Sequence, residues 1–178
     1  IASIGSSGDI HPYIGVGVAL CTRGHEVVFL ANPHFRARIE AAGLHFEPLG
    51  TADEYTALVT NPLLVHPSHG PRFVIRELIA ATCRPMFDAA ARIARDFRPD
   101  LVFRHHIAFG ARWVAEKLDL PCATGVLCPI FWFSRTDPPV FKRGVLEHAP
   151  AWLLRLRLSL GRVVMPLVAD PIFNPLRR

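Results

Sequence analysis

The chain has 178 residues with 51% hydrophobic and 20% charged side chains, a composition that excludes an intrinsically disordered protein and fits about one globular domain. The formal net charge of +5 is unevenly spread, because residues 1–150 carry a net charge of +1 whereas residues 151–178 carry +4. A basic face for nucleic acid across the whole domain is therefore excluded as the default interpretation.

Short apolar strands alternate with helical patterns along the chain. The predicted strands are residues 1–4, 26–31, 44–48, 100–104 and 122–127. Helices are expected from Pro12 onward and over residues 33–42, 73–97 (with a break near Pro85) and 109–118, while residues 49–71 read as a long loop with at most one short helix. The alternation predicts an α/β fold with a doubly wound, Rossmann-like parallel sheet and right-handed crossovers.

The last part of the chain has a different character. An aromatic and proline-rich stretch follows Pro129, and an Arg-dotted apolar helix is expected near residues 151–165. Burial against a further domain explains this apolar excess most simply, and peripheral contact with anionic lipid stays open because of the basic tail. The chain opens abruptly on Ile1, so we expect a fragment at both ends.

Neither the apolar runs nor the cysteines indicate a membrane-spanning or secreted protein. No stretch reaches the roughly 18 apolar residues that span a membrane, and no signal peptide is seen. Cys21, Cys83, Cys122 and Cys128 form no C-x-x-C pair and have apolar neighbours, so we expect buried, reduced thiols. A cytoplasmic protein, with contact to the inner membrane face as an option, is the expectation.

Ligands of open α/β sheets bind beyond the carboxyl ends of the strands. One such place is the turn Gly5-Ser6-Ser7-Gly8, which is followed by Asp9. Its G-x-x-G spacing matches neither the dinucleotide fingerprint nor a P-loop, and no acidic residue follows the second strand, which disfavours a nucleotide-dependent oxidoreductase. Asp9 has two interpretations: a helix-capping carboxylate, or a general base that takes a proton from a hydroxyl group.

Two further groups follow predicted strands at the same edge. His105 and His106 come after the fourth strand, and we expect a polar lining of a pocket there, with structural hydrogen bonding as the alternative; metal binding is disfavoured, with or without His66 and His69. Phe131, Trp132 and Phe133 come after the fifth strand, and three consecutive aromatics cannot all face one core. An apolar ligand wall is one interpretation, and a loop packed on the core is the other.

The run GSSGDIHPYIG at residues 5–15, with the R-G-H-E-V run at residues 23–27, resembles the opening of the GT-B glycosyltransferases. More narrowly, it is similar to the glycosyltransferase family 28 N-terminal domain, the branch of sterol glucosyltransferases, glycopeptide-antibiotic glucosyltransferases and the rhamnolipid rhamnosyltransferase. Weaker matches at residues 42–49, 99–102, 110–121 and 138–142 extend the resemblance to about residue 145.

The resemblance implies the N-terminal, acceptor-binding half of a fold in which two doubly wound domains face each other across a cleft. It implies that Asp9 is the base of an inverting hexosyl transfer. Gly5, Ser6, Ser7 and Gly8 would lie near the donor diphosphate. His11, His105, His106, Phe131, Trp132 and Phe133 would line the pocket of a hydrophobic acceptor such as a lipid, a sterol or a polyketide.

The same resemblance sets the expected partners. The donor would be a UDP- or dTDP-linked sugar, bound through a C-terminal domain that this sequence lacks, with no cofactor, metal or nucleic acid. We expect residues 1–145 to form the acceptor domain and residues 146–178 a tail leading to the missing domain, and this chain alone to be inactive. A non-catalytic acceptor-binding or anchoring subunit of a split glycosyltransferase is the alternative.

Overall fold

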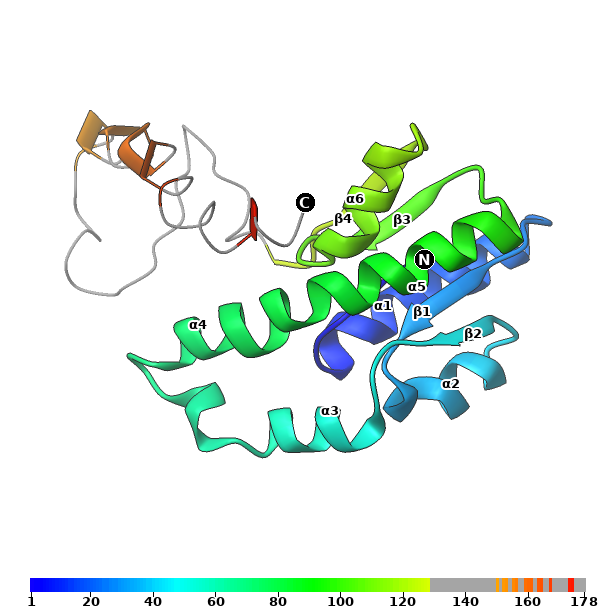
Figure 1. Ribbon diagram of the computed structural model, residues 1–178, viewed down its shortest axis with the longest axis horizontal. Coiled ribbons are helices and arrows are strands. Elements are labelled where there is room, and N and C mark those ends of the chain that lie inside the picture. Colours follow the sequence, from blue (N-terminus) through cyan, green and yellow to red (C-terminus); the bar gives the residue numbers. More distant parts are fainter. Residues whose placement is uncertain are drawn as a thin grey trace. The chain divides into compact units, whose positions relative to one another are not determined.

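The computed structural model describes residues 1–128 continuously, and from Pro150 to Asn174 it describes scattered positions (Figure 1). The chain divides into two compact units, Ile1–Gly125 and Val126–Arg178. The predicted boundary between residues 145 and 146 lies outside the described residues and stays a prediction. Within the second unit, the described residues from Trp152 to Val164 are helical, as the sequence pattern indicates.

The first unit is built on a parallel sheet. Strand β1 (Val28–Ala31) pairs with β2 (His45–Pro48), and β3 (Val102–His105) pairs with β4 (Cys122–Gly125). Ala2 bridges to both inner strands in parallel orientation, through Leu30 of β1 and Arg104 of β3. The extended segment around Ala2 therefore joins the two ladders, and the spatial order is β2, β1, residues 1–4, β3, β4.

This order confirms the predicted doubly wound, Rossmann-like sheet. Successive segments run outward from the centre to β2, and the chain then returns to the other side of the centre for β3 and β4. The reversal lies between residues 1–4 and β3, where the loops that follow two neighbouring strands diverge to opposite faces. In such sheets, a crevice opens at this point beyond the carboxyl ends of the strands.

Helices cover both faces of this sheet. They are α1 (Ser7–Cys21), the 3₁₀ turn η1 (Pro33–Phe35), α2 (Arg36–Ala41), α3 (Ala52–Val59), the 3₁₀ turn η2 (Pro62–Val65), α4 (Gly70–Phe73), the π-helical segment η3 (Val74–Ala80), α5 (Ala81–Phe97) and α6 (Phe109–Lys117).

Alternate residues of β1 supply two separate cores. Phe29 faces a cluster made by α1 and α2, with Ile14 and Ile39 among its members. Leu30 points to the other face, into a cluster with Met86 of α5 and Ala111 of α6. Because side chains alternate along a strand, one buried apolar run serves both layers, as expected for a sheet covered on both faces.

Three of the sequence-based expectations are wrong. Helix α1 begins at Ser7, before Pro12, because Ser6 and Asp9 form a capping box that starts it earlier. The loop at residues 49–71 contains α3 and η2 and ends in the start of α4. Helix α5 continues through Pro85, and the irregular π-helical segment precedes it. Proline has no backbone N–H, so Pro85 cannot donate to the carbonyl of Ala81, four residues earlier. Ala81 is the first residue of α5 and follows η3 directly.

The four cysteines differ in their exposure. Cys83 is buried and Cys21 is partly buried, but Cys122 and Cys128 are exposed, so the expectation of four buried thiols is wrong. Cys122 lies on the outer strand β4, and Cys128 follows this strand in the sequence. No helix among the residues that the structure describes is both long and apolar enough to cross a membrane.

The packing of α5 on α6 predicts the effect of one substitution. A Cβ atom at Gly110 of α6 would lie 2.7 Å from the Phe87 backbone nitrogen and 2.8 Å from the Met86 Cβ. Gly110→Ala should therefore force the two helices apart and lower the free energy of unfolding by about 1–3 kcal/mol. The matched control is Gly15→Ala in α1, where a Cβ meets nothing within 4 Å, and which should stabilise by about 0.5–1 kcal/mol. Equal urea midpoints for the two variants would contradict this packing.

Candidate active site

Asp9 stands in the first turn of α1, at the point where the sheet reverses its order. Its Oδ2 accepts hydrogen bonds from the Ser6 backbone N–H, at 2.7 Å, and from the Ser6 hydroxyl, at 2.9 Å. Its Oδ1 makes neither contact and lies 3.5 Å from Nε2 of His105. About a third of the side chain, 34%, is exposed. The carboxylate therefore caps the helix with one oxygen while the other faces the end of β3.

Gly5 permits this placement of the carboxylate. Its backbone φ is +120°, in the region that favours glycine, and a Cβ atom there would lie 2.7 Å from Asp9 Cγ. Any other residue at position 5 would occupy the space of the carboxylate. Position 5 therefore requires a glycine, because the Asp9 carboxylate occupies the space that a Cβ atom would need.

His105 ends β3 and is 1% exposed. Its ring meets the Tyr13 ring edge-on at 5.6 Å between centroids, and the His106 ring lies 4.2 Å away. The Tyr13 hydroxyl donates to the backbone carbonyls of Gly125, at 2.8 Å, and Arg104, at 3.3 Å. Tyr13 therefore fastens α1 to the ends of β3 and β4, and this brings Asp9 and His105 together.

Arg104 holds the backbone that follows β3. Its side chain is 5% exposed, and its Nη1 donates to the carbonyls of His105, at 3.1 Å, and His106, at 2.9 Å. Burial lowers the pKa of the Arg104 guanidinium from its ordinary value. The buried guanidinium of Arg104 therefore holds the backbone of His105 and His106, where the chain turns after β3.

Burial and charge also set the protonation of the site. Partial burial raises the pKa of Asp9, but the neighbouring His105 and the two Ser6 donors lower it by more, so the pKa lies below its ordinary value. Burial, followed by the electrostatic effect of the neighbouring His105 and Arg104, lowers the pKa of His106 to about 4. At neutral pH, the site therefore holds an ionised Asp9 and a neutral His106.

The other predicted residues are distributed differently. His11 contacts Nη1 of Arg38 on α2 through its Nε2, so it faces α2. Ser7 and Gly8 belong to the first turn of α1. Phe131, Trp132 and Phe133 lie outside the described residues. Their assignment to an acceptor pocket, like that of His11 and His106, stays a prediction; His105, predicted for the same pocket, is 1% exposed and has no open surface toward a ligand.

No group of three or more His, Cys, Asp or Glu side chains in the described residues is placed to hold a metal ion. The rings of His66 and His69 lie tilted against each other with their centroids 4.7 Å apart, and Nδ1 of His66 accepts from backbone N–H groups of the same turn. These two rings are thus engaged locally.

Sequence reasoning missed Tyr13 and Arg104. A signal was present for each: Tyr13 stands one helical turn after Asp9, and Arg104 is a charged residue inside an apolar strand pattern. The pairing of Asp9 with His105 had no sequence signal, because it depends on which strands are neighbours in the sheet.

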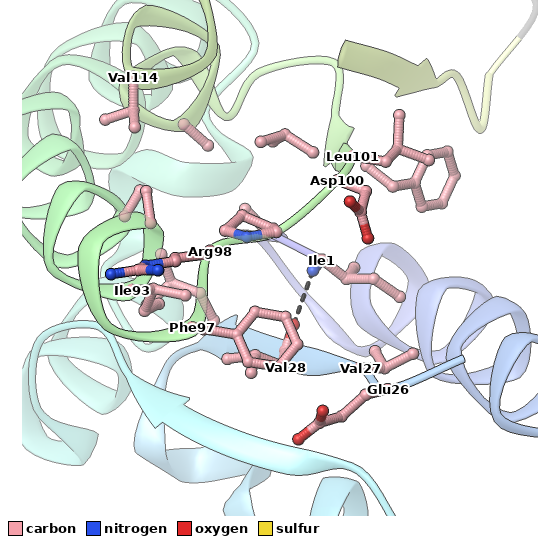
Figure 2. Close-up of a pocket in the computed structure, with 18 of the residues that line it drawn as sticks. Ile1, Glu26, Val27, Val28, Ile93, Phe97, Arg98, Asp100, Leu101 and Val114 are labelled. Carbon is pink, nitrogen blue, oxygen red and sulfur yellow. Dashed lines mark hydrogen bonds between the residues drawn. The ribbon is translucent and has the colours of Figure 1, made fainter. Parts of the chain in front are cut away.

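A cavity of about 490 Å³ opens at the opposite edge of the sheet (Figure 2). Ile1, Val28 and Val102 at the amino ends of three neighbouring strands line it, together with Phe97 at the end of α5. The Ile1 nitrogen donates to the carbonyl of Val28 across its floor at 2.7 Å. Neither Asp9 nor His105 borders this cavity, so it belongs to the other edge of the sheet.

Comparison with known sequences shows what this chain is similar to. The profile described as "Glycosyltransferase family 28 N-terminal domain" matches residues 1–129. The chain is 26% identical over 185 residues to 4'-demethylrebeccamycin synthase of Lentzea aerocolonigenes, covering 100% of this chain and 42% of that protein. It is 27% identical over 164 residues to sterol 3-beta-glucosyltransferase UGT80B1 of Arabidopsis thaliana, covering 86% and 26%. The chain thus spans less than half of either relative.

Solved structures agree on the fold. SsfS6, a glycosyltransferase of Streptomyces sp. SF2575, superposes with a TM-score of 0.56 at 24% identity, over 69% of this chain and 37% of that one. SnogD of Streptomyces nogalater gives 0.57 at 23% identity, over 92% and 39%. SsfS6 has also been solved complexed with thymidine diphosphate. At this identity, the likeness establishes the fold alone.

The lowered pKa of Asp9 predicts a pH-dependent contribution to stability. A carboxyl group with a depressed folded-state pKa stabilises fully above its ordinary value of about 4, and the contribution is lost as the pH falls through the folded-state pKa. Asp9→Asn should lower the free energy of unfolding by about 0.5–1 kcal/mol at pH 7, as for other helix-capping side chains. In urea unfolding, the difference should shrink progressively as the pH falls below about 4, toward the lowered pKa of the folded state. A difference that stays constant down to the acid unfolding of the protein would rule out the ionised cap.

Proposed function

This chain belongs to the glycosyltransferase family 28 N-terminal domain family and has the fold of the N-terminal half of GT-B glycosyltransferases, and from this we propose that it is the acceptor-binding domain of an inverting hexosyltransferase. The complete protein would move a hexose from a nucleotide sugar to a hydroxyl group of a hydrophobic acceptor. The observation that carries the proposal is the carboxylate of Asp9, which is held by Ser6 through one oxygen only.

The proposed reaction needs one proton acceptor from this domain. The hydroxyl oxygen of the acceptor attacks the anomeric carbon from the side opposite the nucleoside diphosphate. The bond from that carbon to the diphosphate oxygen breaks, and the leaving group takes the bonding electron pair, so the configuration inverts. The hydroxyl proton passes to the carboxylate of Asp9.

The protonation of Asp9 suits this role. Its lowered pKa keeps the carboxylate ionised at neutral pH, so it is ready to accept a proton. A carboxylate of low pKa is a weak base toward a free alcohol, but the alcohol becomes acidic as its oxygen bonds to carbon. Proton transfer would therefore come late, when the new bond is well formed.

The first turn of α1 suits the donor side. Ser6, Ser7 and Gly8 are exposed at the helix N-terminus, where backbone N–H groups and the helix dipole favour negative charge. A nucleoside diphosphate held by a second domain would place its phosphates near this turn. The thymidine diphosphate complex of SsfS6 supports a dTDP- or UDP-linked donor.

The relatives support a hydrophobic acceptor. Several matches are named sterol 3-beta-glucosyltransferases, among them those of Arabidopsis thaliana and Saccharomyces cerevisiae. A sterol offers one hydroxyl group on an apolar body, which fits a single polar group at the mouth of an apolar pocket. Among the residues predicted for that pocket, His106 lies beside His105, at the same end of the sheet as Asp9. Phe131, Trp132 and Phe133 lie outside the described residues and stay a prediction from the sequence.

Substitution of Asp9 tests the proposal directly. Asp9→Asn removes the proton acceptor and keeps the shape, so turnover of the complete protein should fall at least about 100-fold, as expected for loss of a general base. Sugar transfer from a panel of UDP- and dTDP-sugars to sterol and polyketide alcohols measures it.

The matched control is Asp119→Asn. Asp119 is exposed and has a φ of 54°, a conformation that Asn also tolerates, so turnover should be unchanged. Wild-type turnover in a well-folded Asp9→Asn protein would return Asp9 to a purely capping role and favour a non-catalytic subunit.

A further inference from the structure

We propose that His105 is a positioning residue, whose N–H at Nε2 orients Oδ1 of the Asp9 carboxylate, the oxygen that Ser6 does not hold. The inference rests on the proposed function of Asp9 as a base and adds a second residue to it. His105 itself is 1% exposed, so it acts on the acceptor only through Asp9.

The two carboxylate oxygens have separate neighbours. Ser6 holds Oδ2 with two donors, and Nε2 of His105 stands 3.5 Å from Oδ1, an ion-pair separation that is longer than a hydrogen bond. A contact at each oxygen fixes the rotation of the carboxylate about its Cβ–Cγ bond. With Ser6 as the only partner of the carboxylate, no contact would fix the position of Oδ1.

The tautomer of His105 follows from the chemistry of its neighbour. An ionised carboxylate oxygen only accepts, so a bare Nε2 would set two lone pairs against each other. A proton on Nε2 makes the same contact attractive. Neither Nε2 nor Nδ1 has a partner within hydrogen-bond distance among the described residues, so the carboxylate at 3.5 Å is the charged group on which the Nε2 proton can act.

Packing does not account for a histidine here. Phe103 stands two residues earlier on the same face of β3, and its ring also packs on Tyr13, at 5.1 Å between centroids. A second phenylalanine would fill position 105 with no buried polar nitrogen. Burying a polar ring without hydrogen bonds costs free energy, so the imidazole at this position needs a purpose, and Asp9 is the charged group beside it.

The imidazole is rigidly held. The backbone of His105 is held on both sides: its N–H donates to the carbonyl of Ala2 at 2.9 Å, and its carbonyl accepts from Nη1 of Arg104. The ring of Tyr13 packs against its edge. A side chain fixed on these sides can hold the carboxylate in one orientation, which is what a positioning group requires.

Other titratable groups also face the carboxylate. His106 follows His105 at the end of β3, Tyr13 lies on α1 and Tyr55 on α3. Burial has the largest effect on the pKa of each, lowering that of His106 and raising those of the two tyrosines, and the charge of Asp9 acts on all three in the upward direction. None of these three contributes to the lowered pKa of Asp9 as His105 does. Loss of His105 should therefore raise the pKa of Asp9, because none of these three groups lowers it in place of His105.

The test compares His105→Phe, which removes the N–H, with His105→Gln, which keeps one. In the complete protein, His105→Phe should lower kcat about 10- to 100-fold, as expected for a displaced catalytic group, and change the acceptor KM less than about threefold. The acidic limb of the kcat/KM profile should move to higher pH, because the carboxylate loses a donor. His105→Gln should recover part of both effects.

A second readout does not depend on activity. In protein with ¹³C-labelled aspartate, the Asp9 carboxyl should titrate at higher pH in His105→Phe than in the wild type, and His105→Gln should lie between. His45→Phe, at an exposed site on β2, is the control and should leave rate and titration unchanged. If His105→Phe does not fold, His105→Gln decides by the same two measurements against the wild type.

The outcomes separate the two proposals. An inactive Asp9→Asn protein, with unchanged kcat, pH profile and Asp9 titration in the His105 variants, overturns the positioning role and leaves the proposed function standing. Equal turnover of the wild type and Asp9→Asn overturns both. A shifted Asp9 titration and a lowered kcat at constant KM support both.

Discussion

The carboxylate of Asp9 is divided between two tasks, and the geometry of the site depends on this division. One oxygen closes the N-terminus of α1 through Ser6, and the other points toward the end of β3. A capping carboxylate ordinarily accepts hydrogen bonds from backbone N–H groups through its oxygens, which makes it a poor base. Here, both donors to Oδ2 come from one serine, so the structural requirement of the helix and the chemistry of a base are met by different atoms.

The sheet order makes this arrangement possible. Ala2 pairs with both β1 and β3, so the chain that leaves residues 1–4 and the chain that leaves β3 start side by side. Gly5 then turns with a positive φ that leaves room for the carboxylate, and Tyr13 ties α1 to the carbonyls of Arg104 and Gly125. The doubly wound sheet thus brings the ends of residues 1–4 and β3 together, and Gly5 and Tyr13 place Asp9 there.

Much of this was predictable from the sequence. The apolar runs and their spacing indicate all five extended segments, because a buried parallel strand requires continuous apolar residues. The run around Asp9 resembles family 28 closely enough to single out the carboxylate. The start of α1 was not predictable in the same way, because Pro12 is a strong signal for a helix start and the Ser6–Asp9 capping box competes with it.

The rest of the site depends on long-range contacts that no local pattern carries. Asp9 and His105 are 96 residues apart in the sequence, and they meet only because β3 lies next to residues 1–4. The burial of Arg104 follows from α6 packing over β3, which a strand pattern does not reveal. The exposure of Cys122 likewise depends on β4 being an outer strand.

The central claim is that Oδ1 of Asp9, the carboxylate oxygen that Ser6 does not hold, receives the proton of the acceptor hydroxyl. The most direct measurement is a crystal structure of the complete protein with a nucleoside diphosphate and an acceptor alcohol bound together. The account predicts that the reacting hydroxyl oxygen lies within about 2.6–3.2 Å of an Asp9 carboxylate oxygen while Ser6 still holds Oδ2. A bound acceptor whose hydroxyl is directed at another residue, with Asp9 wholly engaged by α1, would contradict it.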